Sequence, residues 1–389
     1  MTGIEASPVE RAAALKSLLA RNAPQCDEAR RLPEENIAAL AEAGLFKLQA
    51  PRRFGGLETS VGTFLEVGAE LGEACGSTAW VVALTNSCHW MAGLFCEQAQ
   101  RDVYGADPNV RICGVLAPTA AVRTVDGGLR VGGRWVYASG CLHAQWAILG
   151  VPPVDSRMQG LALIPMSELD IEDTWQVAGM RGTGSNTLVA EDVFVPDHRI
   201  LPVPPAINNE YATEHTDEVL YRASFVPVLA LLLAAPQLGM ARGALKLVIE
   251  KAPVRAVAYT VFARQVDSVA FQLQIAEAAM LIDTAALHIR RAADDIDGAA
   301  AAGVKLDYLT RARVRADTGW AVRNAQKAMD LVISANGASS FAEASALQRL
   351  WRDSNTAARH AVVMPAVNLE LYGKALLGIG WEDNITPLI

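Results

Sequence analysis

The hydrophobic positions change their spacing twice along the chain of 389 residues. From about residue 8 to 111 they recur every three or four residues, which predicts helices. RLPEENIAALAEAGLF is the best delimited of these stretches, because Pro33 suits a first helical turn and Gly44 suits the residue after the last turn. TFLEVGAELGEACG and STAWVVALTNSCHWMAGLF follow the same spacing. We therefore expect a helical region at residues 1–111.

The spacing becomes two residues between about 112 and 205. GGLRVGGRWVYAS, QWAILGV, GLALIPM and NTLVAEDVFVP alternate apolar and polar side chains between Gly, Pro and Asp turns. These runs predict short strands in a compact antiparallel sheet or barrel. PVPPAINNEYATEHTDE, residues 202–218, predicts an irregular crossover to the next region.

From 218 to 389 the helical spacing returns over long segments. We expect helices at about 221–250, 254–298, 304–335 and 343–377, with Pro365 interrupting the last of them. Without a strict heptad pattern, these segments favour an antiparallel bundle over an extended coiled coil. The predicted fold class is α+β, mainly α, in the order helices, sheet, helices.

The segment QRLWRDSNTAARHAVVMP, residues 348–365, is expected to be helical. Arg352, Thr356 and His360 are then spaced i, i+4 and i+8, so that they share one helix face. An arginine, a hydroxyl and an imidazole on one stripe form a candidate polar site.

Composition excludes several classes of partner. The net charge of −8 argues against nucleic acid, which needs a basic face. The most apolar run, PVLALLLAAP, is too short to cross a bilayer, and MTGIEASPVERAAALK has no apolar signal core, so we expect a cytoplasmic protein without membrane contact. The six cysteines form no CxxC pair and the six histidines no HxxxH pair, so neither a disulfide framework nor a metal site is expected.

Two isolated residues carry possible chemistry, each with a plain alternative. Ser139 ends an alternating strand beside Trp135 and Tyr137, as either a turn residue or a hydroxyl presented to a planar ligand. His89 lies on an apolar helix, where a buried core histidine is commoner than a catalyst. The loop GMRGTGSNT has no strand-then-helix context, so it indicates a turn rather than an anion site.

Four blocks, in order along the chain, resemble the acyl-CoA dehydrogenase superfamily. They are GLFKLQAPRRFGGLE (44–58), GRWVYASG (133–140), AGMRGTGSNTLVAEDVFVP (178–196) and NGASSFAEASALQRLWRDSNTAARHAVVMP (336–365). The resemblance is closer to its oxygen-using branch, which includes hydroxyphenylacetate hydroxylases and dibenzothiophene monooxygenase. It implies an N-terminal helical domain (1–111), a central β-barrel (112–217), a C-terminal four-helix bundle (218–389) and a homotetramer.

The same resemblance implies a function. Many dehydrogenases of the superfamily carry a catalytic Glu after the RD motif, whereas this chain has His360 and no acid between Asp353 and Glu370. Without such a base, the rate of α-deprotonation is expected to fall by about 10²–10⁴-fold. The chain is therefore expected to be the oxygenase component of a two-component flavin-dependent monooxygenase. It would hydroxylate a small aromatic or heteroaromatic substrate through a C4a-hydroperoxyflavin made from FMNH2 or FADH2 and O2, with a separate NAD(P)H:flavin reductase. The alternatives are an acyl-CoA dehydrogenase-like oxidoreductase, or N- or S-oxygenation of an amino sugar or thiophene.

Individual positions take roles from the resemblance. It places His360 beside the flavin, the Ser139 hydroxyl against flavin N5 and His89 at the substrate hydroxyl as a base or orienting group. Tyr221 and Arg222 are expected to touch substrate. The residues expected to bind the flavin are Trp135, Tyr137, Ser139, Arg264, Gly337, Ala338, Ser339, Trp351 and Arg352. Some of these would act from a neighbouring subunit, and Arg264 fits the superfamily's flavin motif only loosely.

Overall fold

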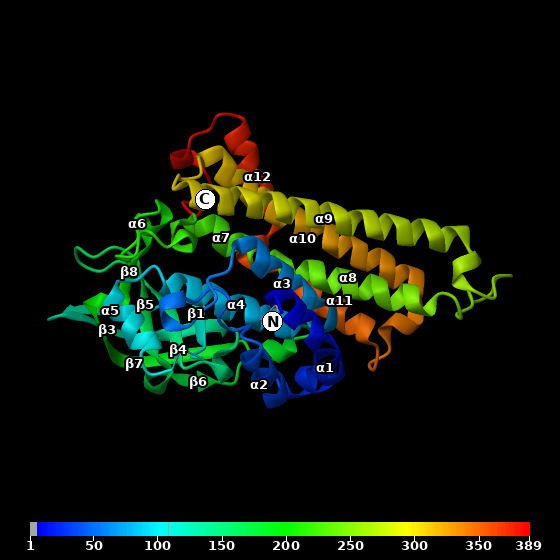
Figure 1. The fold of residues 1–389 in the computed structure, drawn as a ribbon, viewed down its shortest axis with the longest axis horizontal. Helices are drawn as coiled ribbons and strands as arrows, with labels where there is room; N and C mark the ends of the chain where they lie inside the picture. Colours follow the sequence, from blue (N-terminus) through cyan, green and yellow to red (C-terminus); the bar gives the residue numbers. More distant parts are fainter. Residues whose placement is uncertain (1–5, 108) are drawn as a thin grey trace, which may run out of the picture.

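The computed structural model describes residues 6–107 and 109–389. Helices come first, then two small sheets, then long helices that extend away from the sheets (Figure 1). This is the order that the hydrophobic spacing predicts, and the α+β, mainly α fold class is confirmed.

The N-terminal region packs around one central helix. Its helices are α1 (Pro8–Ala29), α2 (Glu34–Glu42), α3 (Val61–Ala74), α4 (Gly76–Ala92) and α5 (Glu97–Tyr104). Almost every residue of α4 is buried, including the polar side chains of Thr85, Asn86 and His89. Since a helix that is buried on all sides has no solvent face, its polar groups need partners inside the protein.

The strands form two four-stranded sheets, in the orders β1-β4-β5-β8 and β2-β3-β7-β6. The strands are β1 (Ile112–Val115), β2 (Ala121–Val125), β3 (Gly128–Ala138), β4 (Trp146–Val151), β5 (Gly160–Pro165), β6 (Asp170–Glu172), β7 (Asn186–Pro196) and β8 (Ile200–Pro202). β1 and β4 run parallel and the other described pairs antiparallel, which corrects the expectation of a purely antiparallel sheet. Side chains of both sheets, with Trp135 as the largest, share one core.

The C-terminal region contains the longest helices. They are α6 (Val203–Ile207), α7 (Phe225–Leu231), α8 (Ala234–Lys251), α9 (Val269–Ala302), α10 (Tyr308–Asn336), α11 (Ala346–Ala357) and α12 (Pro365–Leu376). In Figure 1, α8, α9 and α10 run side by side to the end opposite the sheets.

The predicted helix at 254–298 begins too early. Residues 252–268 form an irregular segment, and α9 starts only after Ser268, whose hydroxyl accepts a hydrogen bond from the Phe271 amide. Pro253 explains the end of α8, because proline has no N–H to continue the helical hydrogen bonds and its ring crowds the carbonyl four residues earlier.

The predicted stripe of Arg352, Thr356 and His360 is also wrong. α11 ends at Ala357, and His360 has extended backbone at φ −61° and ψ 132°, where its ring nitrogen accepts from the Val362 amide at 3.4 Å. The imidazole caps a short 3-10 turn instead of continuing the helix face.

One core cluster joins the N-terminal helices to the C-terminal ones, as in the packing of α3 on α8. Domain boundaries at 111/112 and 217/218 therefore stay a prediction. Two helical stretches, Phe225–Lys251 and Val269–Ala302, are long and apolar enough to cross a membrane by length and composition alone. In the first, 89% of the most apolar 18-residue window is buried within the fold, which is typical of a core helix.

Candidate functional site

A chain of three hydroxyl groups ends at Ser139. The Ser139 Oγ lies 2.7 Å from the Ser185 Oγ, which lies 2.6 Å from the Thr183 Oγ1. Thr183 in turn donates to the Met180 carbonyl at 2.8 Å. All three hydroxyl-bearing residues are buried. Ser139 is therefore part of a polar network rather than an isolated turn residue.

A β-bulge next to Ser139 separates the two aromatic residues of the same strand. The register of β3 against β7 shifts between Trp135 and Ala138, and Tyr137 has a positive φ of 69°. Tyr137 is 68% exposed and packs edge-on against Trp175, with ring centroids 6.0 Å apart. It stands open to a ligand, as a flavin-flanking residue must.

Trp135 does not share that position. Its side chain is 0% exposed inside the core of the sheets, and its indole N–H donates to the Gly150 carbonyl at 2.9 Å. The ring is enclosed by the core of the sheets and its one polar atom is already paired, which corrects the expectation that Trp135 flanks the isoalloxazine. The bulge that sends Tyr137 outward leaves Trp135 on the inner face of the strand.

His360 lies against the central helix although it is outside α11. Its ring meets the ring of Trp80 edge-on, with centroids 5.8 Å apart. The His360 side chain is exposed in the single chain, while the crowding of protein on its other sides lowers the pKa of the imidazole below its ordinary value. Because the protein packed against it disfavours the charged form, a neutral ring is favoured at neutral pH.

A buried carboxylate ties α11 to the loop that carries Thr183. The Asp353 Oδ1 accepts from the Met180 amide at 2.5 Å, and burial raises the pKa of this carboxyl to about 7. The next residue, Ser354, donates to Gln237 of α8 at 2.6 Å. The RD segment therefore fixes the loop and the bundle to each other.

His89 sits deep in the N-terminal region. It is 0% exposed, and its Nδ1 lies 3.0 Å from the Tyr104 hydroxyl, with the rings stacked at 5.7 Å. Burial lowers the pKa of the His89 imidazole to about 3, so the ring is neutral. Among the described residues its Nε2 has no partner at hydrogen-bond geometry, although the Val110 backbone lies near the ring. A buried polar atom of this kind is expected to meet a ligand or water.

Other unpartnered polar atoms belong to residues linked to His89 through Tyr104. The Tyr104 ring stacks on Phe54 at 5.2 Å, and the neighbouring Arg53 pairs with Glu218. Within the described ranges, the buried Gln49 Oε1 and Glu218 Oε2 also lack hydrogen-bond partners, whereas the Arg53 Nε lies 3.5 Å from a carboxylate oxygen of Glu97. Polar atoms left over among aromatic rings suit a small aromatic ligand with a hydroxyl group.

Tyr221 and Arg222 each bind a backbone carbonyl, and their contact with substrate stays a prediction. The Tyr221 hydroxyl donates to the Gln49 carbonyl at 2.9 Å, and its ring fills the space beside Gly93. Arg222 donates to the Thr216 carbonyl at 2.7 Å. In this structure both side chains hold backbone segments in place.

The residues expected near the flavin phosphate lie at the far end of the bundle. Gly337 has a φ of 74° with open space around it, followed by a 3-10 turn (Ala338–Phe341). Arg255 of the irregular segment 252–268 donates to Asn336 and to the Ser339 hydroxyl. Arg264 forms an exposed pair with Asp267, and the next residue, Gln265, donates to the Ala335 carbonyl. Arg255 is absent from the sequence-based candidates, although it bonds Ser339, and flavin binding at this end of the bundle stays a prediction.

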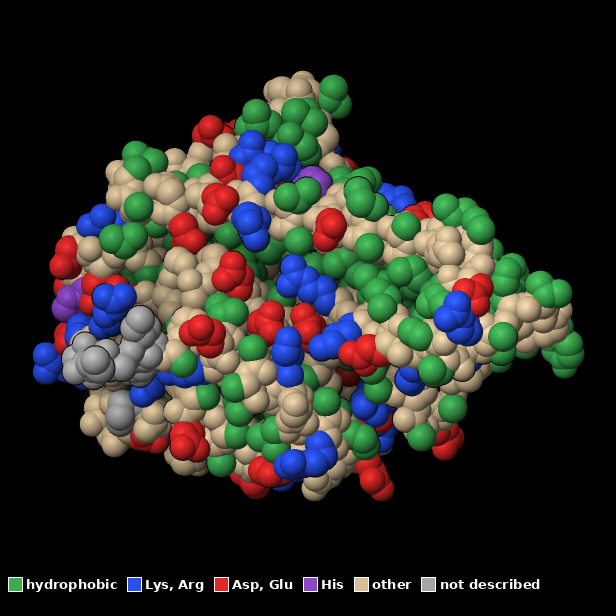
Figure 2. Space-filling view, turned by 45° about the vertical axis from the view of Figure 1, so that its right-hand side comes forward, with side chains coloured by type: hydrophobic (Ala, Val, Ile, Leu, Met, Phe, Trp, Pro, Cys, Tyr) green, Lys and Arg blue, Asp and Glu red, His purple; other side chains and the backbone are tan. Residues whose placement is uncertain are grey.

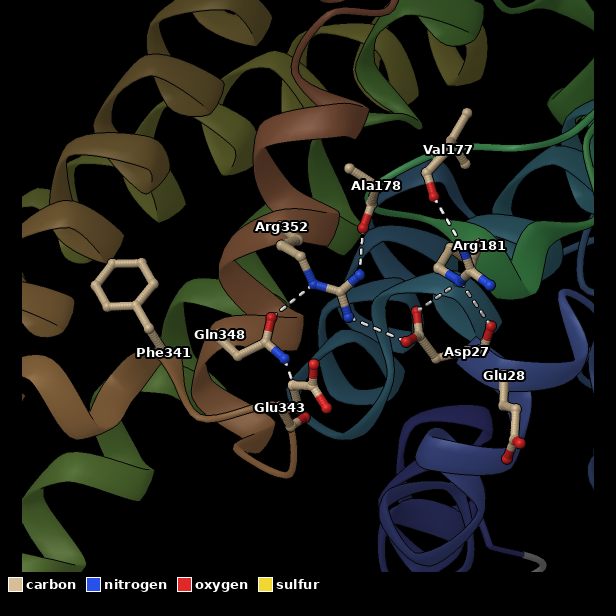
Figure 3. Close-up of a pocket in the computed structure, with 9 residues that line it drawn as sticks. All are labelled: Asp27, Glu28, Val177, Ala178, Arg181, Phe341, Glu343, Gln348 and Arg352. Atoms are coloured by element: carbon tan, nitrogen blue, oxygen red, sulfur yellow. Dashed lines mark hydrogen bonds and ion pairs between the residues drawn. The ribbon is translucent and has the colours of Figure 1, made fainter.

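A pocket of about 490 Å³ contains Arg352 (Figure 3). Both Arg352 and Arg181 point toward Asp27, whose carboxylate lies 3.0 Å and 3.8 Å from them. Arg352 also donates to Gln348 at 2.6 Å and to the Ala178 carbonyl. Since the two guanidinium groups already face a carboxylate, the single chain does not form a basic pocket here. The indole of Trp351 donates to Asp330 at 2.8 Å instead of facing the pocket.

Ser185, Thr183 and Tyr104 are absent from the sequence-based set of candidates. Thr183 and Ser185 lie in the loop that seemed a plain turn, and Tyr104 is fifteen positions after His89 on another helix. Only the pairing of β3 with β7 brings Ser139 to Ser185. A search for hydroxyl residues in that glycine-rich loop is the one signal that could have found two of them.

Family models cover both helical regions. The acyl-CoA dehydrogenase N-terminal domain matches residues 10–107, and the acyl-CoA dehydrogenase C-terminal domain matches residues 231–365.

Individual relatives match over nearly the whole chain. The flavin-dependent monooxygenase oxygenase subunit HsaA of Rhodococcus jostii is 35% identical over 382 residues, 97% of this chain and 100% of that protein. The FADH(2)-dependent resorcinol hydroxylase oxygenase component of a Rhizobium strain is 33% identical, over 95% of this chain and 94% of that protein. The structure of XiaF from Streptomyces, in complex with FADH2 and glycerol, superposes with a TM-score of 0.93 at 38% identity, over 98% of this chain and 96% of that one.

Proposed function

The chain belongs to the oxygenase components of two-component flavin-dependent monooxygenases, within the acyl-CoA dehydrogenase superfamily, and from that premise we propose that it hydroxylates a small phenol. The observation that carries the choice of a phenol is His89. A neutral, fully buried imidazole with one ring nitrogen held and the other unpartnered is a binding group for a single hydroxyl.

The hydrogen bonds of Tyr104 define what His89 offers. The Tyr104 hydroxyl has one proton and two acceptors nearby, His89 Nδ1 at 3.0 Å and the His89 carbonyl at 3.4 Å. We assign the proton to the shorter contact, so Nδ1 accepts and Nε2 carries the ring proton. His89 is then a donor to the substrate oxygen and orients it, which narrows the expected choice between base and orienting group.

The residues around Ser139 fit a flavin. The exposed Tyr137 ring offers a planar face, and the buried Ser139 hydroxyl offers one polar contact beside it. Reduced FMN or FAD supplies the two electrons that activate O2 when it is bound. The edge-on pair of Trp80 and His360 adds an apolar wall and a neutral imidazole donor. An apolar wall limits water, which a site using reduced flavin and O2 requires.

The reductase and the assembly are also proposals. Reduced flavin is supplied by a separate NAD(P)H:flavin reductase, which the relatives' description as oxygenase components supports.

The homotetramer is supported by α9, where Leu273, Met280 and Leu287 are each about two-thirds exposed and seven residues apart. Figure 2 shows hydrophobic side chains gathered over the long helices. A second copy of the same helix covers such a stripe. A cytoplasmic location stays a prediction.

The test measures where the electrons of reduced flavin go. Protein, FMNH2 or FADH2, O2 and a panel of resorcinol, 4-hydroxyphenylacetate and phenol are mixed, and hydroxylated product and H2O2 are both quantified. Ser139→Ala and His360→Ala are expected to lower product and raise H2O2. His89→Ala is expected to lose product most strongly, because the substrate loses its orienting donor. The matched control is His288→Ala, since His288 pairs with Asp317 within the bundle at 2.7 Å. An unchanged ratio of product to H2O2 in all three variants would refute the proposed site.

A further inference from the structure

We infer that Thr183 and Ser185 are positioning residues that hold the Ser139 hydroxyl as a hydrogen-bond acceptor, so that the site selects reduced flavin over oxidised flavin. The inference rests on the proposed function, because it requires Ser139 to face the N5 edge of a flavin.

The direction of each hydrogen bond follows from counting protons. A hydroxyl carries one proton, and a carbonyl can only accept. The Thr183 proton goes to the Met180 carbonyl at 2.8 Å. Ser185, at 2.6 Å from Thr183, must then donate to Thr183, and Ser139, at 2.7 Å from Ser185, must donate to Ser185. The Ser139 oxygen keeps lone pairs but has no proton left to offer.

The Met180 end of this chain of hydrogen bonds is held by several contacts. The Met180 carbonyl also accepts from the Trp175 indole at 2.9 Å, and the Met180 amide donates to Asp353. The carbonyl also accepts from the Thr183 amide at 3.2 Å, and because a carbonyl cannot donate, its 2.8 Å contact with the Thr183 hydroxyl oxygen requires the Thr183 proton. Thr183 and Ser185 are 2% and 3% exposed, so water does not compete freely for their protons.

The fixed direction of these hydrogen bonds distinguishes the two redox states of a flavin. In oxidised flavin the N5 atom has a lone pair and no proton, so it needs a donor. In reduced flavin N5 carries a proton and needs an acceptor. A Ser139 oxygen that can only accept therefore receives a hydrogen bond from the N5–H of reduced flavin. In oxidised flavin the same oxygen would face the N5 lone pair with a lone pair of its own, which is repulsive. Selection for the reduced state suits an enzyme that receives its flavin already reduced.

The test is an anaerobic binding titration of FMN and of dithionite-reduced FMN, with Kd(oxidised)/Kd(reduced) as the readout. Wild-type protein is expected to bind reduced FMN more tightly. Thr183→Val removes one hydroxyl at nearly constant shape and frees the Ser185 proton, so the ratio is expected to fall about tenfold, the effect of one hydrogen bond. Thr183→Ser keeps the hydroxyl and is expected to keep the ratio within about twofold.

Two further measurements distinguish a change in the direction of these hydrogen bonds from a general loss of structure at the site. Ser185→Ala frees the Ser139 proton directly, so oxidised FMN is expected to bind more tightly than it does to wild type. Reduced 5-deaza-FMN, which has carbon in place of N5, is expected to show no difference between wild type and Thr183→Val. A merely structural loss would weaken both redox states equally and leave the ratio unchanged.

The outcomes are distinct. If wild type prefers reduced FMN and Thr183→Val and Ser185→Ala both keep that preference, the polarity inference is wrong and the proposed function stands. If wild type binds neither FMN nor FAD in either redox state, the proposed function fails and the inference fails with it.

Discussion

Asp353 offers a direct test of how the loop at Met180 is held. It is 3% exposed, and its carboxylate accepts from the Met180 amide at 2.5 Å. Replacing it by asparagine keeps an oxygen acceptor of the same reach and removes the buried charge. The change therefore separates the hydrogen bond from the cost of burying a carboxylate.

The magnitude follows from the pKa. Burial raises the pKa of Asp353 from 3.8 to about 7, so the folded protein holds a proton that the unfolded chain releases. The stability that this proton provides is complete below the unfolded pKa and is lost as the pH rises from about 4 through about 7. A change of that size corresponds to at most about 4 kcal/mol. The asparagine amide does not titrate, so Asp353→Asn is expected to gain stability relative to wild type across this interval.

The assay is urea unfolding of wild type and Asp353→Asn between pH 4.5 and 8, followed by circular dichroism. The free energy of unfolding of the variant minus that of wild type is expected to rise steadily with pH and to level off above about pH 7. Asp330→Asn is the control, because Asp330 is an exposed aspartate of α10 that also accepts one hydrogen bond. A difference that stays constant with pH would refute the raised pKa, whatever its sign.

Three other predictions follow from the contacts. Trp135→Phe leaves the Gly150 carbonyl without its donor and is expected to lower the free energy of unfolding by about 1–3 kcal/mol in urea titrations, with flavin affinity unchanged; a weaker flavin affinity at unchanged stability would return Trp135 to the site. Tyr104→Phe is expected to raise KM for the phenol and the share of H2O2, because His89 loses its oriented ring proton; an unchanged KM with undiminished coupling would contradict the assignment. Met280→Asp is expected to reduce the molar mass measured by light scattering, since a charge on the exposed stripe of α9 opposes packing of a second copy; an unchanged mass would exclude that interface.

The sequence predicted the elements well wherever hydrophobic spacing is regular. The strand GGLRVGGRWVYAS and the helix STAWVVALTNSCHWMAGLF appear as β3 and α4. Spacing failed where a local effect ended the regularity. The segment after α8 keeps apolar residues yet leaves the helix before Pro253, and the backbone turns extended at His360 three residues after α11.

The site was predictable only in part, because its hydrogen bonds join residues that are distant in sequence. Ser139 was chosen by its place at a strand end, but its partner Ser185 is 46 positions away. His89 was expected to be a buried core histidine more often than a catalyst. The structure shows the burial, with Nδ1 beside Tyr104 and Nε2 unpartnered among the described residues, and its role toward substrate stays a proposal. Trp135 was assigned to the flavin site incorrectly, because the alternation of apolar and polar residues cannot reveal the β-bulge that follows it.

The central claim is that this chain transfers an oxygen atom from O2 to a phenol by using reduced flavin made elsewhere. Its most direct test is a single turnover of the protein loaded with FMNH2 or FADH2, mixed with 18O2 and the same phenol panel, with no reductase present. The account predicts one 18O atom in the hydroxylated product and at most one product per reduced flavin. Unlabelled phenols, with all electrons recovered as H2O2, would contradict it.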